Sequence, residues 1–195
     1  CPAGTDIPAY MEQIRAGIAQ RDGAAPTLKF EERPRRTPFF FGEPFRYPKA
    51  EIPDSAMVAF FDSCELRGVP FGHALGYVVR LPDALCEEER RMASRLCFRL
   101  RAARRANAFL PSGLYATIHA VGDYGGADAV YPELLRFIEE NGCAAAGDFV
   151  EEYLLDELTG ENPKEYRLRI SVRVERVSSR TSRTGFAASG RNARA

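Results

Sequence analysis

The sequence lacks the features that mark membrane-spanning, nucleic-acid-coating and fibrous proteins. No uninterrupted apolar run approaches the roughly 20 residues that span a bilayer. Basic and acidic side chains balance at 27 each, so no overall field attracts the chain to nucleic acid or to an anionic membrane. We therefore expect no membrane partner, and the partner has to be identified from a site rather than from the net charge.

Cysteine, histidine and lysine are scarce as well. The five cysteines and two histidines form no CxxC pair and show no spacing typical of metal ligands. We expect a reduced, cytoplasmic compartment, no metal and no cofactor. Only three of the 27 basic residues are lysines, an imbalance that we attribute to the base composition of the genome rather than to chemistry.

What is present is an ordinary globular composition. Hydrophobic residues make up 45% and charged residues 28% of the 195 positions, which excludes wholesale disorder, coiled coil and collagen. A chain of this length forms one domain or two small internal repeats. It begins with Cys1 and shows neither an initiator Met nor an apolar signal region, so we expect it to be cut from a longer protein; a mature lipoprotein, which also begins with Cys, is the alternative.

The hydrophobic pattern predicts an α+β protein in which one order of elements occurs twice. Strand, helix, strand and strand are expected over about residues 26–106 and again over about 107–176. The elements expected in the first module are an extended arm over 27–41, a helix over 54–68, and strands over 71–81 and 92–101, with a loop over 82–89. Those of the second module are strands over 113–121, 148–155 and 166–174 and a helix from 128 to about 140.

The two ends of the chain differ from the modules. Apolar residues at helical spacing over 7–20 predict that residues 1–25 hold the end of a linker or dimerisation helix. From residue 178 onward the chain has no acidic residue and only one Phe, so we expect residues 177–195 to form a disordered tail.

The helix from residue 128 has a defined inner face. Val130, Leu134, Phe137 and Ile138 are expected to point toward the core. Pro132 is expected in the first turn, where its missing N–H costs nothing.

The sharpest feature is a pair of adjacent glutamates in the strand over 148–155. Strand alternation places Glu151 on one face with Phe149 and Tyr153, and Glu152 on the other face. If either face is the core, a carboxylate lies in an apolar, aromatic setting, which is costly unless a cationic partner compensates it. The alternative is that one face is wet, one glutamate points to water, and the other lies at the strand end or pairs with an arginine.

A tyrosine on the next strand belongs to the same argument. Tyr166 is the first of a series of alternate apolar residues in its strand and is expected to face inward with them. An aromatic ring beside a carboxylate suits a lipophilic cation, because the ring quadrupole and the negative charge attract the same partner. The alternative is an ordinary core tyrosine whose hydroxyl reaches a carbonyl.

Other candidates are weaker. His73 and His119 lie singly on expected strands, and a hydrogen-bonded structural role is favoured over a catalytic one. The arginines between residues 90 and 105 resemble a phosphate stripe, but their alternation favours a solvated face. The glycine-rich stretch at 122–126 precedes a helix and lacks the lysine and spacing of a phosphate loop.

Spaced motifs over residues 108–175 resemble the GyrI-like (gyrase-inhibitor-like) effector-binding domain found at the C-terminus of MerR-family transcription regulators. The residues that carry the resemblance are Leu110–Ile118, Gly122–Tyr124, Tyr131, Leu134–Ile138, Asn141–Gly142, Glu151–Leu154 and Glu165–Arg167. The resemblance implies two strand-helix-strand-strand modules related by a pseudo-twofold, with a curved antiparallel sheet, two helices on one side and a ligand cleft. It also implies that Glu151 and Tyr166 contact an aromatic or lipophilic cationic ligand.

The resemblance leads to a full set of site and partner expectations. The residues expected to bind the ligand are Glu151, Tyr166, Phe71, Tyr77, Phe41, Tyr124 and Met92. No residue is expected to be catalytic. MerR-family regulators begin with a winged helix-turn-helix, which this chain does not show, so DNA is expected as a partner only through a region outside it, and the full-length protein is expected to be a homodimer. Two alternatives stay open: a GyrI-like hydrolase of small electrophiles, and a stand-alone inhibitor that docks on a protein such as gyrase.

Overall fold

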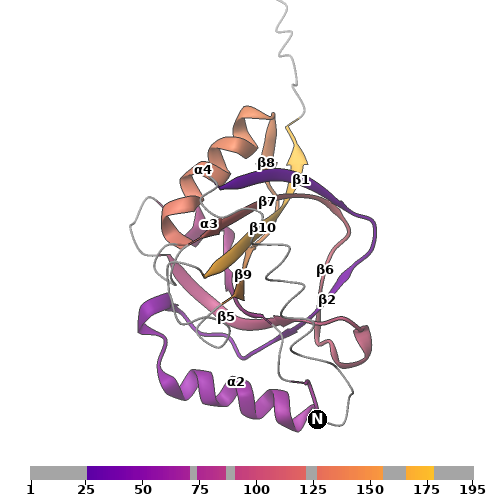
Figure 1. Cartoon of the computed structure of the whole chain (residues 1–195), viewed down its shortest axis with the longest axis vertical. Coiled ribbons are helices and arrows are strands. Elements are labelled where there is room, and N and C mark those ends of the chain that lie inside the picture. The colour runs from indigo at the N-terminus through magenta and orange to yellow at the C-terminus, as the bar shows by residue number, and fades with distance from the viewer. Residues whose placement is uncertain (1–25, 71–73, 87–90, 122–126, 156–165, 178–195) are drawn as a thin grey trace, which may run out of the picture.

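The computed structural model describes residues 26–70, 74–86, 91–121, 127–155 and 166–177 (Figure 1). The expected helix over 7–20, residues 178–195 of the expected tail, Phe71 and Tyr124 lie outside the described residues.

The described strands form one curved sheet of ten strands whose pairs are antiparallel. The order along the sheet is β1-β7-β10-β9-β4-β5-β2-β6, with β3 beside β5 and β8 beside β10. The strands are β1 (Thr27–Arg33), β2 (Thr37–Phe41), β3 (Tyr47–Pro48), β4 (Leu75–Val79), β5 (Met92–Arg99), β6 (Ala108–Leu110), β7 (Gly113–Val121), β8 (Cys143–Ala145), β9 (Phe149–Leu155) and β10 (Arg167–Arg176). The helices are η1 (Lys49–Glu51), α2 (Asp54–Leu66), α3 (Leu81–Ala84), η2 (Ala103–Arg105) and α4 (Ala127–Glu140).

The sheet order confirms the duplicated strand-helix-strand-strand arrangement. The first module runs β2, α2, β4, β5 along the chain, and the second runs β7, α4, β9, β10. Along the sheet the second module has the order β7-β10-β9, and the first module, counted from the opposite edge, has the equivalent order β2-β5-β4. The two modules therefore join where β4 pairs with β9. This join brings Tyr77 of β4 opposite Glu151 of β9.

Both long helices cover the same face of the sheet. Phe60 and Cys64 of α2, and Leu134 and Ile138 of α4, belong to one buried apolar cluster with alternate residues of the central strands. In Figure 1, α2 lies along the bottom and α4 at the upper left, with the sheet curving between them. The prediction of two helices on one side is confirmed, and the site sought between them must lie on this face, which we call the helix face.

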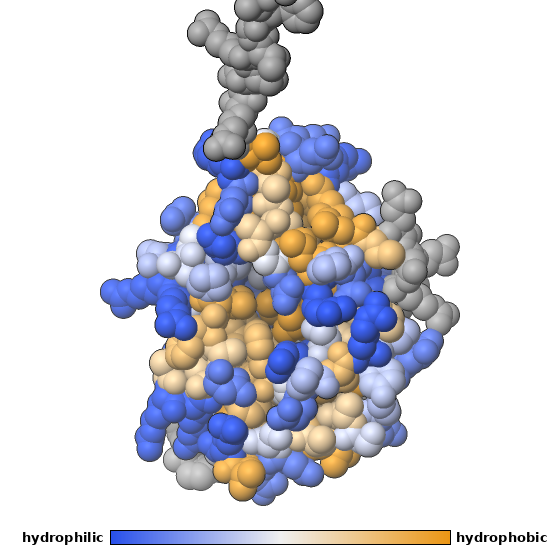
Figure 2. Space-filling model, turned by 180° about the vertical axis from the view of Figure 1, so that it is seen from behind, coloured by the Kyte–Doolittle hydropathy of each residue, from blue (hydrophilic) through white to orange (hydrophobic). Residues whose placement is uncertain are grey.

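The opposite face has a smaller apolar cluster. Phe39, Val78, Cys97 and Val150 form it, because they are the alternate residues of β2, β4, β5 and β9. Seen from behind, the molecule shows apolar side chains over the middle of the view with hydrophilic side chains around them (Figure 2).

Two departures of element boundaries from the sequence expectation affect residues near the site. The stretch expected as a loop over 82–89 begins inside a short helix, α3, which starts at Leu81. The helix α4 starts at Ala127, so Pro132 lies in its second turn and not in its first. The inner face of α4 is accordingly formed by Ala127, Tyr131, Leu134 and Ile138, while Val130 and Phe137 are only half-buried.

One glycine sets how closely the two modules approach. A Cβ built at Gly76 in β4 would collide with the backbone carbonyl oxygen of Glu151 in β9. Only glycine allows the central strands to lie this close, and this contact fixes the backbone that carries the Glu151 side chain.

Candidate functional site

The Glu151 carboxylate lies on the helix face at the join between the modules and is 0% exposed. Its neighbours in register are Tyr77 on β4 and Ile170 on β10. Phe149 and Tyr153 lie on the same face of its own strand and are buried too. The predicted shared face of Glu151, Phe149 and Tyr153 is confirmed, and of the two possibilities left open for that face the structure shows the core and not a wet face.

Two tyrosine hydroxyls donate to this carboxylate. The Tyr131 hydroxyl lies 2.7 Å from Glu151 Oε1, and the Tyr153 hydroxyl lies 3.4 Å from Oε2. Burial, with the adjacent negative charge of Glu151, raises the pKa of both tyrosines above the usual value. Both hydroxyls therefore stay protonated and act as donors to the carboxylate oxygens.

A lysine from the first module supplies the positive charge. Lys49, in η1, places its Nζ 2.9 Å from Glu151 Oε1 and 3.2 Å from Oε2. The same nitrogen lies 2.7 Å from Oδ1 of Asp128 at the start of α4. Its side chain is only 4% exposed, so the ammonium is held between two carboxylates and away from water.

Arg91 completes the cluster through a gap that Pro132 leaves in α4. Because proline has no N–H, the Asp128 carbonyl one turn earlier receives no bond from position 132. Arg91 Nη1 donates to that carbonyl at 3.1 Å, and the guanidinium lies 4.4 Å from the centroid of the Tyr131 ring. Two carboxylates and two cations are thereby packed around one tyrosine, and their formal charges cancel.

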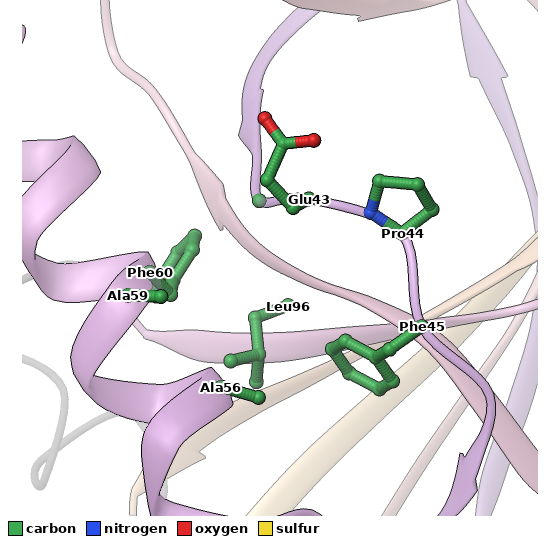
Figure 3. Close-up of a pocket in the computed structure, with 8 residues that line it drawn as sticks. Glu43, Pro44, Phe45, Ala56, Ala59, Phe60 and Leu96 are labelled. Carbon is green, nitrogen blue, oxygen red and sulfur yellow. The ribbon is translucent and has the colours of Figure 1, made fainter.

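A small apolar pocket lies in the first module (Figure 3). It has a volume of about 100 Å³ and lies between α2, the segment after β2, and β5. Its lining residues are Gly42, Glu43, Pro44, Phe45, Ala56, Ala59, Phe60 and Leu96.

The pocket and the carboxylate belong to one row across the sheet. Leu96 of β5 is in register with Tyr77 of β4, and Tyr77 is in register with Glu151 of β9. Neighbouring strands lie about 4.8 Å apart, so the pocket floor and Glu151 are separated by about 10 Å with Tyr77 between them.

Three of the residues expected to bind the ligand, besides Glu151, lie on β4, directly before β10, and on β5. Tyr77 is buried next to Glu151, with its ring 5.6 Å from that of Tyr153. Tyr166 is buried directly before β10, and Met92 is in register with Pro48, the residue before Lys49.

Phe41 requires a correction. It packs against Phe39, 5.7 Å between ring centroids, in the cluster on the face opposite Glu151. Strand alternation sends Phe40, and not Phe41, to the helix face.

Sequence reasoning missed the partners of Glu151. It did not single out Lys49, Asp128 or Arg91 as site residues, and it treated Tyr131 only as part of a motif. Two signals were available: Lys49 is one of three lysines in an arginine-rich chain, and Asp128 and Tyr131 are one helical turn apart.

The second glutamate has arginine partners on the opposite face. Glu152 is 2% exposed and is bound by Arg99 at 2.9 Å and by Arg169 at 2.9 and 3.0 Å. The alternative in which one glutamate points to water is therefore wrong, although the arginine pairing that it contained is correct. The prediction that the arginines between 90 and 105 form a solvated face is also wrong for two of them. Arg91 belongs to the Glu151 cluster, and Arg99 is paired with Glu152.

The described part of the chain offers little else for chemistry. No group of three or more histidine, cysteine or acidic side chains in it could hold a metal ion. No helix among the described residues has both the length and the apolar character needed to cross a membrane.

Comparison with known sequences supports the resemblance inferred from the motifs. Residues 109–175 match the family model of the GyrI-like small molecule binding domain. The multidrug-efflux transporter 2 regulator of Bacillus subtilis (strain 168) is 33% identical over 67 residues, which are 34% of this chain and 24% of that protein. The chain thus matches about a quarter of the length of this curated relative.

Comparison with solved structures agrees with the observed fold. The C-terminal domain of EcmrR superposes with a TM-score of 0.55 at 17% identity, covering 78% of this chain and 98% of that domain. EcmrR in its complex with DNA superposes with a TM-score of 0.58 at 16% identity, covering 88% of this chain and 66% of that one. The fold is therefore that of the EcmrR C-terminal domain, and residues 109–175 are similar to GyrI-like small molecule binding domains.

Proposed function

We propose that this chain is the effector-binding part of a MerR-type transcription regulator and that it binds aromatic or lipophilic cations without converting them. The observation that carries the proposal is the buried Glu151 carboxylate, held by two tyrosine hydroxyls at the end of a row that leads to an apolar pocket. The GyrI-like match and the similarity to a multidrug-efflux regulator support the same function. The output would reach DNA through a DNA-binding segment of the same regulator, in a homodimer.

The two ends of the row suit the two parts of such a ligand. The rings of Phe45 and Phe60 with the Leu96 side chain would receive an aromatic group, because burial of its apolar surface is favourable. Tyr77 would lie against the middle of the ligand. The positive charge would lie at Glu151, where aromatic faces and a carboxylate attract the same cation.

The test is calorimetric titration with tetraphenylphosphonium, and with triphenylphosphine oxide as a neutral compound of similar shape. We expect Glu151→Gln to weaken binding of the cation at least tenfold and to leave binding of the neutral compound unchanged. Glu140→Gln is the matched control, because that carboxylate is 65% exposed on α4. Equal affinities of the wild type and Glu151→Gln for the cation would remove Glu151 from the mechanism.

A second readout separates binding from catalysis. The proposal expects a saturable complex from which the ligand is recovered unchanged, as measured by chromatography after long incubation. Steady consumption of a reactive ester or epoxide, lost in Glu151→Gln, would instead favour a hydrolase in which the carboxylate acts as base.

A further inference from the structure

The position that the proposed function assigns to a ligand cation is already filled by the protein. The Lys49 ammonium lies within 3.2 Å of both Glu151 oxygens and 2.7 Å from Asp128. A second cation brought to Glu151 while Lys49 stays would face a like charge at short range in a poorly solvated site. Lys49 therefore has to leave before the carboxylate can bind a ligand.

The pocket is also too small in its present shape. Its volume of about 100 Å³ accommodates a single small group, whereas sites for drug-sized ligands measure roughly 300–1,000 Å³. The pocket has to widen for the same ligand that displaces Lys49.

Both obstacles belong to one short segment, residues 42–49, which we call the Lys49 strap. Gly42 and Phe45 line the pocket, and the Lys49 ammonium is paired with the Glu151 carboxylate. Figure 3 shows the Phe45 ring of the strap directed across the pocket toward Leu96 of β5 and Ala56 of α2. One movement of the strap away from the sheet would open the pocket and free Glu151 together.

The strap has few backbone bonds to the rest of the sheet. They are Gly42 N–H to the Leu96 carbonyl and Phe45 N–H to the Ser94 carbonyl, each 2.9 Å, followed by the two-residue strand β3. Its side-chain attachments besides Lys49 include a bond from Arg95 Nη1 to the Gly42 carbonyl at 3.0 Å and an ion pair of Arg46 with Asp83 at 2.8 Å, in which the Arg46 side chain is 59% exposed. Segments with few backbone bonds and short pairing open at low free-energy cost relative to core strands.

Departure of Lys49 affects the two carboxylates differently. Glu151 keeps the hydroxyls of Tyr131 and Tyr153. Asp128 keeps only the backbone N–H of Arg91, 3.5 Å from Oδ2, and its Oδ1 loses the ammonium, so the ligand or water has to replace Lys49 there as well. The ligand's charge replaces that of the ammonium at Glu151, and the ammonium regains its hydration in water.

We propose that Lys49 is a built-in competitor for the ligand's positive charge, and that the Lys49 strap opens when a lipophilic cation binds. The inference rests on the proposed function and adds a rule of selectivity to it. A small, strongly hydrated ammonium gains nothing over Lys49, so the site selects cations whose charge is spread over a bulky apolar body. The apparent affinity is reduced by the fraction of molecules in which the strap is open.

The test compares Lys49→Met with Lys29→Met, a matched change of an exposed lysine on β1. We expect Lys49→Met to bind tetraphenylphosphonium at least tenfold more tightly than the wild type, and Lys29→Met to bind as the wild type does. In the double variant Lys49→Met, Glu151→Gln the gain should disappear, because the freed carboxylate is its cause.

A measurement on the wild-type protein covers the case in which Lys49→Met fails to fold. Hydrogen–deuterium exchange of the peptide that contains Gly42 and Phe45 should increase on saturation with tetraphenylphosphonium, while exchange in β9 decreases. Glu151-dependent binding with no gain in Lys49→Met and no faster exchange in the strap would overturn the inference and leave the proposed function standing. Absence of binding to both the wild type and Lys49→Met would overturn both.

Discussion

The hydrogen bond from Tyr131 to Glu151 offers a direct measure of how strongly the buried charge is held. Tyr131→Phe removes the hydroxyl that lies 2.7 Å from Glu151 Oε1 and leaves the ring in place, at a position that is 0% exposed. A hydrogen bond to a charged group contributes about 1.5–3 kcal/mol, more than a neutral one, and the buried carboxylate oxygen would lose a donor. We expect the free energy of unfolding, measured in urea, to fall by about 2–3 kcal/mol.

Tyr115→Phe provides a control matched in burial and geometry. The Tyr115 hydroxyl donates to the neutral carbonyl of Pro111 at 2.8 Å, and Tyr115 is 2% exposed. Its loss should cost about 1 kcal/mol, as is typical of neutral hydrogen bonds. In a Glu151→Gln background, Tyr131→Phe should also cost only about 1 kcal/mol, because its acceptor is then neutral. If Tyr131→Phe and Tyr115→Phe cost the same in the wild-type background, the carboxylate does not carry the stability argued here.

Other variants test the remaining charges. Glu152→Gln should lower the free energy of unfolding by about 1.5–3 kcal/mol, because two partly buried arginines lose hydrogen bonds to a charged acceptor. Glu140→Gln, at an exposed pair, should change it by less than about 0.5 kcal/mol. Burial of Asp83 opposes its ionisation, but hydrogen bonds from two arginines outweigh this and hold its pKa below the usual value, so its contribution is present above about pH 4 and lost as the pH falls further. Urea unfolding between pH 3 and 7 should show the difference between wild type and Asp83→Asn shrinking below pH 4; a constant difference would contradict this. Lys49→Arg should bind tetraphenylphosphonium more weakly than the wild type in the same titrations, and equal or tighter binding would show that release of the native cation does not limit affinity.

The parts of the site that follow from local pattern could be predicted from the sequence. Alternation along one strand is enough to place Glu151 and Glu152 on opposite faces, whatever the strand pairs with. The burial of both could not be derived in this way, because alternation does not tell whether a sheet has one wet face or two covered ones. The motifs over 108–175 carried the remaining information, because they belong to one continuous module.

The parts that depend on long-range contacts could not be predicted. Lys49 reaches Glu151 across 102 positions of the chain, and no local pattern connects them. Three consecutive aromatic residues stand at positions 39–41, so the sequence does not tell which of them point toward the helices. The pairing of β2 with β5 decides that Phe40 does. The role of Pro132 depended on a helix boundary one residue earlier than expected, and boundaries are fixed by packing as much as by capping residues.

The two buried glutamates show why the identity of the compensating cation matters for function. Glu152 is bound by two arginines, whose planar guanidinium groups offer several donors in fixed geometry and hold the carboxylate rigidly. Glu151 is compensated by a lysine, a point charge on a flexible stem that is strongly hydrated once it reaches water. In a chain that uses arginine for nearly all of its positive charge, lysine lies at the carboxylate that shares a row of the sheet with the pocket. A permanent structural pair would be better served by arginine, so the presence of lysine at this position is physically consistent with a charge that must be given up when a ligand arrives.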